Sequence, residues 1–168
     1  WMESLGVDIV SSSLGYSDWY TWPDMDGKTA TTSKAARVAT RKGVLVVTAM
    51  GNAGLATVRR PDGQFALMAL ADADSIVAVG ATLSDATLAS FSLTGPTYDG
   101  RVKPEIVAQG VNVFAVSADT GYTPYFGGTS ASTPLAAGVA ALILSANPRL
   151  TPVEVRARML NTARQIFD

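Results

Sequence analysis

A serine between a double glycine and an apolar run is the residue of this chain best suited to nucleophilic chemistry. Ser130 follows Gly127-Gly128 and precedes Pro134, and the run 135–144 is apolar all round. That run predicts a buried helix, with the hydroxyl residues and the proline of 129–134 in its first turn. Free N–H groups and the positive end of the helix dipole would lie beside Ser130, where an attacking oxygen and an oxyanion both need stabilisation. The competing interpretation is that these hydroxyl groups only cap a core helix.

Asn52 also has two interpretations. It follows Gly51 at the end of the apolar run 44–50. Asparagine and glycine are the ordinary residues of a turn that needs left-handed backbone. An asparagine amide is also a neutral donor that can stabilise an oxyanion without titrating. The residues alone leave both roles open.

A base for the serine is missing from the sequence. The chain contains no histidine, and a serine hydroxyl at its free pKa is a poor nucleophile. Lysine could replace histidine as the base, but no lysine is predicted to have the apolar surroundings that lower its pKa. All four lysines lie in polar segments: Lys28, Lys34, Lys42 and Lys103. We therefore expect this chain to be inactive by itself.

The elements that would position these residues are predicted to alternate between strands and helices. Short apolar runs predict strands at 7–12, 44–50 and 75–81, with a helix over 31–42 that stops at Gly43. Strand, helix and strand at this spacing form a parallel α/β unit. Further strands are expected at 104–108 and 111–117, and 122–126 would complete a hairpin that leads to the serine. A capping box that begins at Thr151 predicts a last helix that runs to about Arg164.

Composition narrows the class of protein. A length of 168 residues with 48% hydrophobic content suits one domain or a large part of one. The net charge of −1 argues against nucleic acid or an anionic membrane as a partner. The absence of cysteine excludes disulfides, and the absence of histidine removes the commonest metal ligand. The run 135–144 is too short to span a bilayer.

Several segments resemble, in order, the sequence blocks of the subtilases, the subtilisin-like serine proteases. The segment 128–134 resembles the family's nucleophile motif, and 44–54 is similar to its oxyanion-asparagine strand. The segment 7–15 is similar to the substrate-binding strand. A fourth block, Phe91-Ser92 with Gly95-Pro96 followed by 99–108, is similar to a segment common in larger members. The blocks are distributed, in this order, along most of the chain.

The resemblance implies roles for individual residues. Ser130 would attack a peptide carbonyl, and Asn52 with the Ser130 N–H would hold the oxyanion. In subtilisin itself such an asparagine is worth roughly a hundredfold to a thousandfold in rate. The strand ending at Gly15 would pair main chain to main chain with an extended polypeptide, and its glycine would leave room for a substrate side chain. The implied substrate-binding residues are Ser13, Leu14, Gly15, Ala49, Gly51, Gly128 and Thr129.

The resemblance also implies that part of the active site lies elsewhere. Subtilases carry their catalytic groups in the order aspartate, histidine, serine, and the first two precede the substrate-binding strand. We therefore interpret residues 1–168 as the C-terminal portion of a single peptidase S8-like catalytic domain, an α/β, three-layer parallel-sheet fold without its N-terminal part. That missing part would be a partner of this one. No cofactor or metal is expected in this segment; a calcium site, which the resemblance permits, would belong to the missing part. A secreted or cell-envelope location is implied in the same way.

Two alternatives to a protease remain open. Met50, Gln109 and Leu135 depart from the residues usual in subtilases, which is compatible with a pseudoprotease or peptide-binding module that has lost catalysis. An α/β ligand-binding domain is the third hypothesis, although the glycines of 51–63 form neither GxGxxG nor a P-loop. An aspartate-bearing strand and a His-Gly helix start upstream of Trp1 would favour the enzyme.

Overall fold

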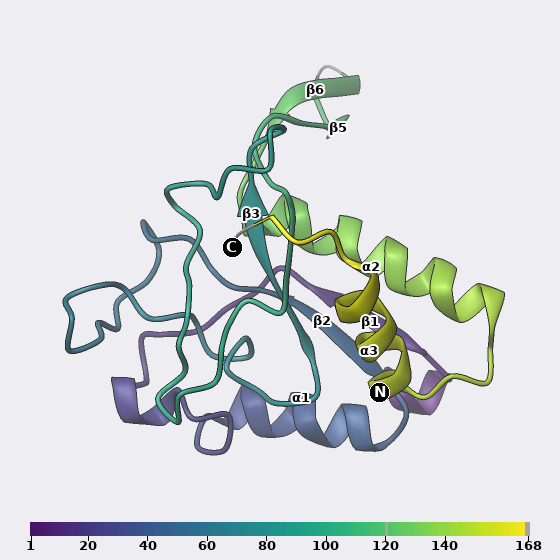
Figure 1. Ribbon diagram of the computed structural model, residues 1–168, viewed down its shortest axis with the longest axis horizontal. Helices are drawn as coiled ribbons and strands as arrows, with labels where there is room; N and C mark the ends of the chain where they lie inside the picture. Colours follow the sequence, from purple (N-terminus) through teal and green to yellow (C-terminus); the bar gives the residue numbers. More distant parts are fainter. Residues whose placement is uncertain (120, 167–168) are drawn as a thin grey trace.

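Four parallel strands form the central sheet, in the order β1-β2-β3-β4 (Figure 1). The computed structural model describes residues 1–119 and 121–166. The strands are β1 (Ile9–Ser12), β2 (Leu45–Ala49), β3 (Val77–Thr82) and β4 (Ile106–Gln109). In register, Val10 lies opposite Val46 and Val47 opposite Val77. Every residue of β2 and β3 is buried, as expected for apolar strands covered on both faces of a parallel sheet.

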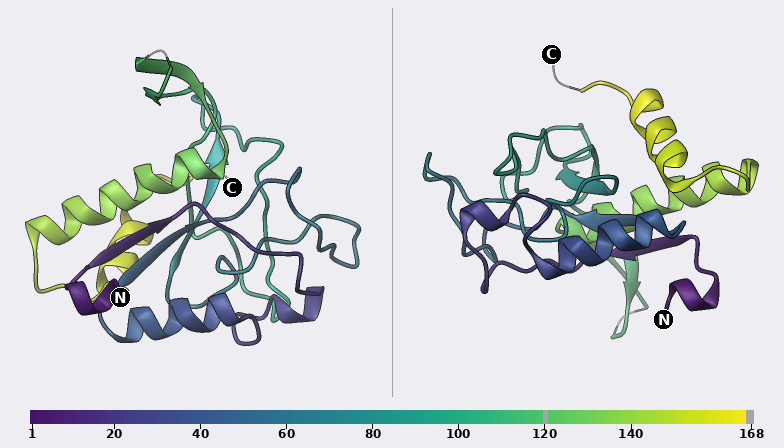
Figure 2. Two further views of the ribbon diagram at one scale, coloured as in Figure 1. Left: turned by 180° about the vertical axis from the view of Figure 1, so that it is seen from behind. Right: turned by 90° about the horizontal axis from the view of Figure 1, so that it is seen from below.

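Helices cover both faces of this sheet. Helix α1 (Thr31–Arg41) lies on one face, and α2 (Thr129–Ala146) with α3 (Pro152–Thr162) lies on the other (Figure 2). Val46 packs in the same core cluster as Ala36 of α1, whereas Val47 packs with Ala140 of α2. The alternation of side chains along β2 thus supplies both cores. The predicted α/β architecture in three layers is confirmed.

Helix α2 differs from its prediction at its N-terminus. It begins at Thr129, so Pro134 lies inside the helix rather than in its first turn. Proline lacks an N–H, so the carbonyl of Ser130, four residues earlier, loses the donor that it would otherwise have in the helix. The Ser13 hydroxyl donates to that carbonyl instead, at 3.1 Å. A hydrogen bond from a distant segment therefore replaces the one that the proline removes.

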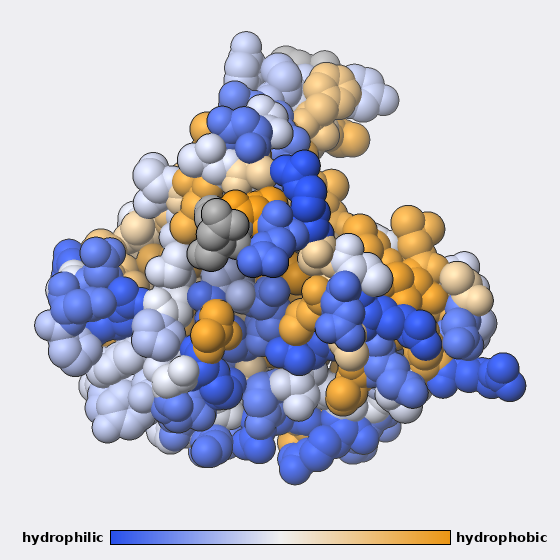
Figure 3. Space-filling model, viewed as in Figure 1, coloured by the Kyte–Doolittle hydropathy of each residue, from blue (hydrophilic) through white to orange (hydrophobic). Residues whose placement is uncertain are grey.

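The burial predicted for this helix holds for one face only. Ala136, Ala137 and Ala140 are buried against the sheet. Leu135, Val139 and Leu142 recur at helical spacing and are 45%, 49% and 73% exposed. Figure 3 shows apolar residues gathered over α2, beside the projecting hairpin. The prediction of a helix buried all round was wrong, because the sheet covers a single side of α2.

Length and composition would allow α2 to cross a membrane. It has 18 residues with a mean hydropathy of 1.4, so it is longer than the apolar run 135–144 that was judged too short to span a bilayer. Its small residues pack on the sheet, however, and the core helix of a soluble protein meets the same criterion. Among the residues that the structure describes, no other helix meets it.

Smaller elements complete the described fold. Short 3-10 helices occupy Glu3–Leu5 and Trp22–Asp24. Strands β5 (Val113–Ser117) and β6 (Gly121–Phe126) pair antiparallel in a hairpin that projects from the body (Figures 1 and 2). The hairpin leads into α2 as predicted. The capping box is confirmed, since Thr151 accepts from the Glu154 N–H and donates its own N–H to the Glu154 carboxylate.

Candidate active site

The segments after β1 and β2 and the first turn of α2 meet at one edge of the sheet. Ser13 follows β1, Asn52 lies three residues after β2, and Ser130 lies in the first turn of α2. Because the strands are parallel, their carboxyl ends lie at the same edge, which is where α/β folds usually bind ligands. The hydrogen bond from Ser13 to the Ser130 carbonyl and those between Asn52 and Thr129 join the three segments. The two residues predicted to catalyse therefore lie on contacting segments.

Ser130 is half-buried at the start of α2. As a residue of the first turn it has no intrahelical acceptor for its N–H. Its hydroxyl makes no hydrogen bond to any residue within 1–119 or 121–166. The neighbouring hydroxyls are occupied, because Ser132 and Thr133 both donate to the Thr129 carbonyl. Ser130 is thus the hydroxyl of this turn that is left for chemistry.

The Asn52 side chain is fixed by hydrogen bonds to the helix start. Its Oδ1 accepts from the Thr129 N–H at 3.0 Å and from the Thr129 hydroxyl at 3.1 Å, and this hydroxyl accepts from the Gly51 N–H at 3.3 Å. The two donors identify the amide oxygen and turn Nδ2 away from them. Across the part of the chain that the structure describes, Nδ2 has no hydrogen-bond acceptor. It is therefore a free donor held beside α2.

Two further observations concern the same asparagine. The Asn52 carbonyl accepts from the Leu55 N–H at 2.9 Å, so the residue begins a turn, but the left-handed backbone of this segment lies at Gly51, whose φ is +100°. A Cβ on Gly128 would lie 3.2 Å from Asn52 Nδ2, and the φ of this glycine is +107°. A side chain there would crowd the amide and strain the backbone. The turn role, the cap role and a free donor are all compatible with one geometry.

A methionine that no motif indicated packs between the two substrate-binding segments. A Cβ on Gly51, whose φ is +100°, would lie 2.6 Å from both Cγ and Sδ of Met68. A Cβ on Gly15 would lie 2.8 Å from the Met68 Cβ. The Met68 N–H donates to the Met50 carbonyl at 3.1 Å. The space at both glycines is thus used by Met68, which gives Gly15 a packing reason in addition to the one expected for substrate.

The remaining predicted substrate-binding residues divide by exposure. Leu14 is 63% exposed and Ser13 is also exposed, so this segment faces outward. Ala49 and Thr129 are buried at 4% and 1% exposure. They support the site from within the fold.

One lysine has surroundings that the sequence did not predict. Lys103 is 5% exposed, and burial lowers the pKa of its ammonium group. Its Nζ donates to the Ala73 carbonyl at 2.8 Å and pairs with Glu105 at 2.6 Å. Both Ala73 and Lys103 precede their strands, at the edge opposite Ser130. The expectation that no lysine has an altered pKa was wrong, but this lysine lies away from the serine.

No group of three or more His, Cys, Asp or Glu side chains could hold a metal ion among the residues described, 1–119 and 121–166.

Comparison with solved structures identifies the fold. A cold adapted subtilisin-like serine proteinase aligns with a TM-score of 0.71 and 28% identity, over 94% of this chain and 49% of its own. The self-cleaved protease domain of PatA aligns with a TM-score of 0.74 and 28% identity, over 97% of this chain and 56% of its own. The fold is therefore subtilisin-like.

Comparison of sequences gives the family. The model of the subtilase family, Peptidase_S8, matches residues 1–168, and the chain belongs to this family. It is 35% identical over 168 residues to Subtilisin DY of Bacillus licheniformis, covering 100% of this chain and 54% of that protein. It is 34% identical over 175 residues to Serine protease AprX of Bacillus subtilis, covering 92% of this chain and 37% of that protein. The chain thus spans between about a third and about half of the length of these relatives.

Proposed function

We propose that this chain supplies the nucleophile and the oxyanion donors of a subtilisin-like serine endopeptidase. The observation that carries the proposal is the fixed Asn52 amide, whose Oδ1 is held by α2 while Nδ2 stays free. Ser130 lies in the first turn of the same helix, and its hydroxyl has no hydrogen-bond partner among the described residues. A preorganised donor beside a free nucleophile is the arrangement that acyl transfer requires.

The proposed reaction proceeds through an acyl-enzyme. The Ser130 hydroxyl attacks the carbonyl carbon of a peptide bond and passes its proton to a base. The carbonyl oxygen becomes an oxyanion that accepts hydrogen bonds from Asn52 Nδ2 and the Ser130 N–H. The base returns the proton to the departing amine as the C–N bond breaks, and water then hydrolyses the ester to release the acid and restore the serine.

The base is assigned to a part of the protein upstream of this segment. In this proposal residues 1–168 are the C-terminal portion of one catalytic domain, and the aspartate and histidine of the triad precede them. The lengths of the relatives support this, as do the place of β1 at the edge of the described sheet and the exposed apolar face of α2. Any calcium site is assigned to that upstream part, and no cofactor is assigned to this one. The substrate is a polypeptide, and the protein is assigned to the cell exterior or envelope.

Hydrolysis of a chromogenic peptide by the full-length protein tests the proposal. Ser130→Ala removes the nucleophile and abolishes turnover. Ser132→Ala is the matched control, because this buried hydroxyl only donates to the Thr129 carbonyl. Equal activity in the two variants would refute the assignment. Binding of the peptide without cleavage by the unaltered protein would identify a peptide-binding module instead.

A further inference from the structure

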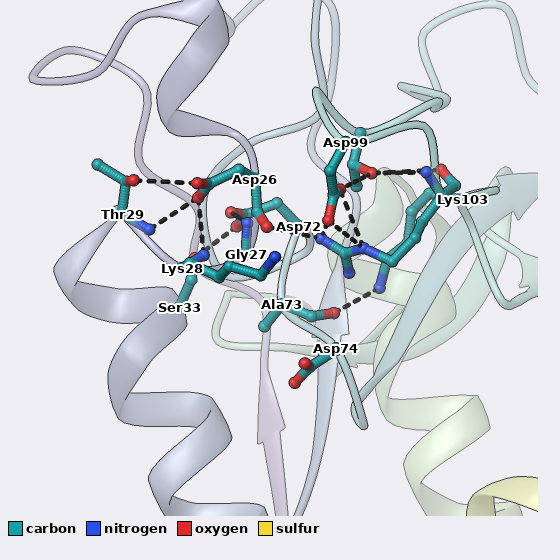
Figure 4. Close-up of polar contacts among 12 residues, drawn as sticks. Asp26, Gly27, Lys28, Thr29, Ser33, Asp72, Ala73, Asp74, Asp99 and Lys103 are labelled. Atoms are coloured by element: carbon teal, nitrogen blue, oxygen red, sulfur yellow. Dashed lines mark hydrogen bonds and ion pairs between the residues drawn. The ribbon is translucent and has the colours of Figure 1, made fainter.

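A buried carboxylate lies outside the catalytic segments and joins three parts of the chain. Asp72 has 0% exposure, and its Oδ2 accepts from the Gly27 N–H at 2.7 Å. Its Oδ1 accepts from the Ser33 hydroxyl and, at 3.2 Å, from the Leu70 N–H. Figure 4 shows Asp72 among residues of the loop before α1, Ser33 in the first turn of α1, and the residues that follow Asp72 in its own segment. One side chain thus holds a loop, a helix and its own segment together.

Asp72 has no cationic partner to offset its burial. Among the described residues, no lysine or arginine forms an ion pair with it. Arg101 is nearby but pairs with Asp99 and donates to the Asp26 carbonyl. Burial raises the pKa of Asp72 despite the hydrogen bonds that lower it. A buried, unpaired carboxylate is costly for stability alone, so its geometry suggests another use.

The segment that Asp72 holds contains a strained residue. Leu70 has a φ of +97°, a backbone conformation that residues other than glycine rarely adopt. Its N–H donates to both Ser33 and Asp72. On either side, Ala71 donates to the Met68 carbonyl and Ala73 donates to the Leu70 carbonyl. Surrounding contacts must maintain such a conformation, and Asp72 supplies one of them.

The other end of the same segment is bonded to both substrate-binding segments. Met68 donates to the Met50 carbonyl, directly before Gly51. Ala69 donates to the Tyr16 carbonyl at 2.8 Å and accepts from the Tyr16 N–H at 3.4 Å, directly after Gly15. The Met68 side chain fills the space between the two glycines. Segment 68–72 therefore connects the substrate-binding segments to the anchor at Asp72.

We propose that Asp72 is a positioning residue of the peptidase, which fixes segment 68–72 and so sets the space that Met68 leaves for a substrate side chain. The inference rests on the proposed function. Loss of the anchor lets Met68 shift relative to Gly15 and Gly51. The change alters which side chains are accepted, whereas Ser130 and Asn52, whose hydrogen bonds are made to other residues than Asp72 and its donors, keep their geometry.

The test compares two carboxylates of one segment in the full-length protein. Asp72→Asn keeps the shape of the side chain but replaces one acceptor oxygen with an NH₂ group. Asp74→Asn is the matched control, because Asp74 is half-exposed and forms an ion pair with Arg37 of α1. Each variant is assayed for kcat and KM on peptides that differ in the residue on the amino side of the scissile bond, from alanine to phenylalanine.

The expected result is a change in preference without loss of chemistry. Asp72→Asn shifts the ratio of kcat/KM between the small and the large side chain by about tenfold, the size of effect expected when a pocket changes by one methylene or more. The shift arises mainly in KM, and Asp74→Asn leaves the ratio unchanged. Amide hydrogen exchange at Met68 and Ala69 becomes faster in Asp72→Asn alone. Ser33→Ala removes one donor to the carboxylate and gives a smaller shift in the same direction.

Three outcomes overturn the inference. A lower Tm in Asp72→Asn with an unchanged ratio of kcat/KM assigns Asp72 to stability alone. If Asp72→Asn fails to fold, an unchanged ratio in Ser33→Ala decides against positioning. Absence of any Ser130-dependent cleavage by the unaltered protein refutes the proposed function and, with it, the role of Asp72. Ser130-dependent cleavage whose kcat/KM ratio is the same in Asp72→Asn refutes only the role of Asp72.

Discussion

Replacement of Asn52 separates its role in the helix start from its role in chemistry. Asn52→Ala removes both the acceptor for Thr129 and the free Nδ2 donor. Thr129 is 1% exposed, so its N–H and hydroxyl lose their partner in a buried place. The free energy of unfolding should fall by about 2 kcal/mol, as for a lost helix cap whose donors stay buried. Loss of the oxyanion donor should lower kcat by about a hundredfold or more with little change in KM.

Asn52→Asp distinguishes the two effects. It keeps Oδ1 for Thr129, and its charge lies at the N-terminus of α2, where the helix dipole favours an anion. Its unfolding free energy should therefore stay within about 1 kcal/mol of the original. The donor is lost and a negative oxygen faces the oxyanion, so kcat falls at least as far as in Asn52→Ala.

Thermal unfolding and steady-state kinetics of the two variants in the full-length protein decide the matter. A stable Asn52→Asp variant with normal kcat would show that the asparagine only caps α2 and makes a turn. A stable variant without activity supports the oxyanion role.

Three further predictions concern packing, pH and the isolated chain. Gly51→Ala should lower the unfolding free energy by about 3 kcal/mol, because its Cβ meets Met68 and its φ is positive. Gly54→Ala, with no atom near its Cβ, should change stability by less than about 0.5 kcal/mol, and equal melting temperatures of the two would contradict the packing argument. Burial would raise the pKa of Asp26, but hydrogen bonds from Lys28 and Thr29 outweigh it and hold the pKa below 3.8. The stability that Asp26 contributes is therefore present above pH 3.8 and is lost as the pH falls through the folded-state pKa. The Tm difference between the original and Asp26→Ala should therefore shrink below pH 3.8, and a difference that is constant with pH would oppose this. Residues 1–168 expressed alone should aggregate or unfold without cooperativity in urea and hydrolyse no peptide, since α2 exposes an apolar face and β1 lies at the edge of the sheet; a cooperative transition or turnover would contradict this.

The parallel α/β framework could be predicted from local sequence because its elements are strongly patterned. The apolar runs at 44–50 and 75–81 contain β2 and most of β3, since buried parallel strands are apolar at every position. The capping box at Thr151 placed the start of α3 correctly. Pro134 was predicted in the first turn of α2, because proline normally marks a first turn, but it lies inside the helix. Its tolerance here depends on Ser13, more than a hundred residues away.

The parts of the site that could not be predicted depend on distant contacts. Met68 lies in no motif, and its position becomes clear only from its close packing against Gly15 and Gly51 in the structure. Lys103 is in a polar segment, and its burial depends on Glu105, which also pairs with Arg156 of α3. Asp72 is one of several aspartates, and its donors come from Gly27 and Ser33. Each of these positions is set by tertiary packing, which no local pattern contains.

Covalent labelling of the full-length protein with a fluorophosphonate tests the central claim most directly. The probe reacts with a serine only when a base and an oxyanion site activate it. Peptide mass spectrometry should locate one adduct on Ser130, absent in Ser130→Ala and retained in Ser132→Ala. An adduct on another serine, or no adduct in a folded protein, would contradict the account.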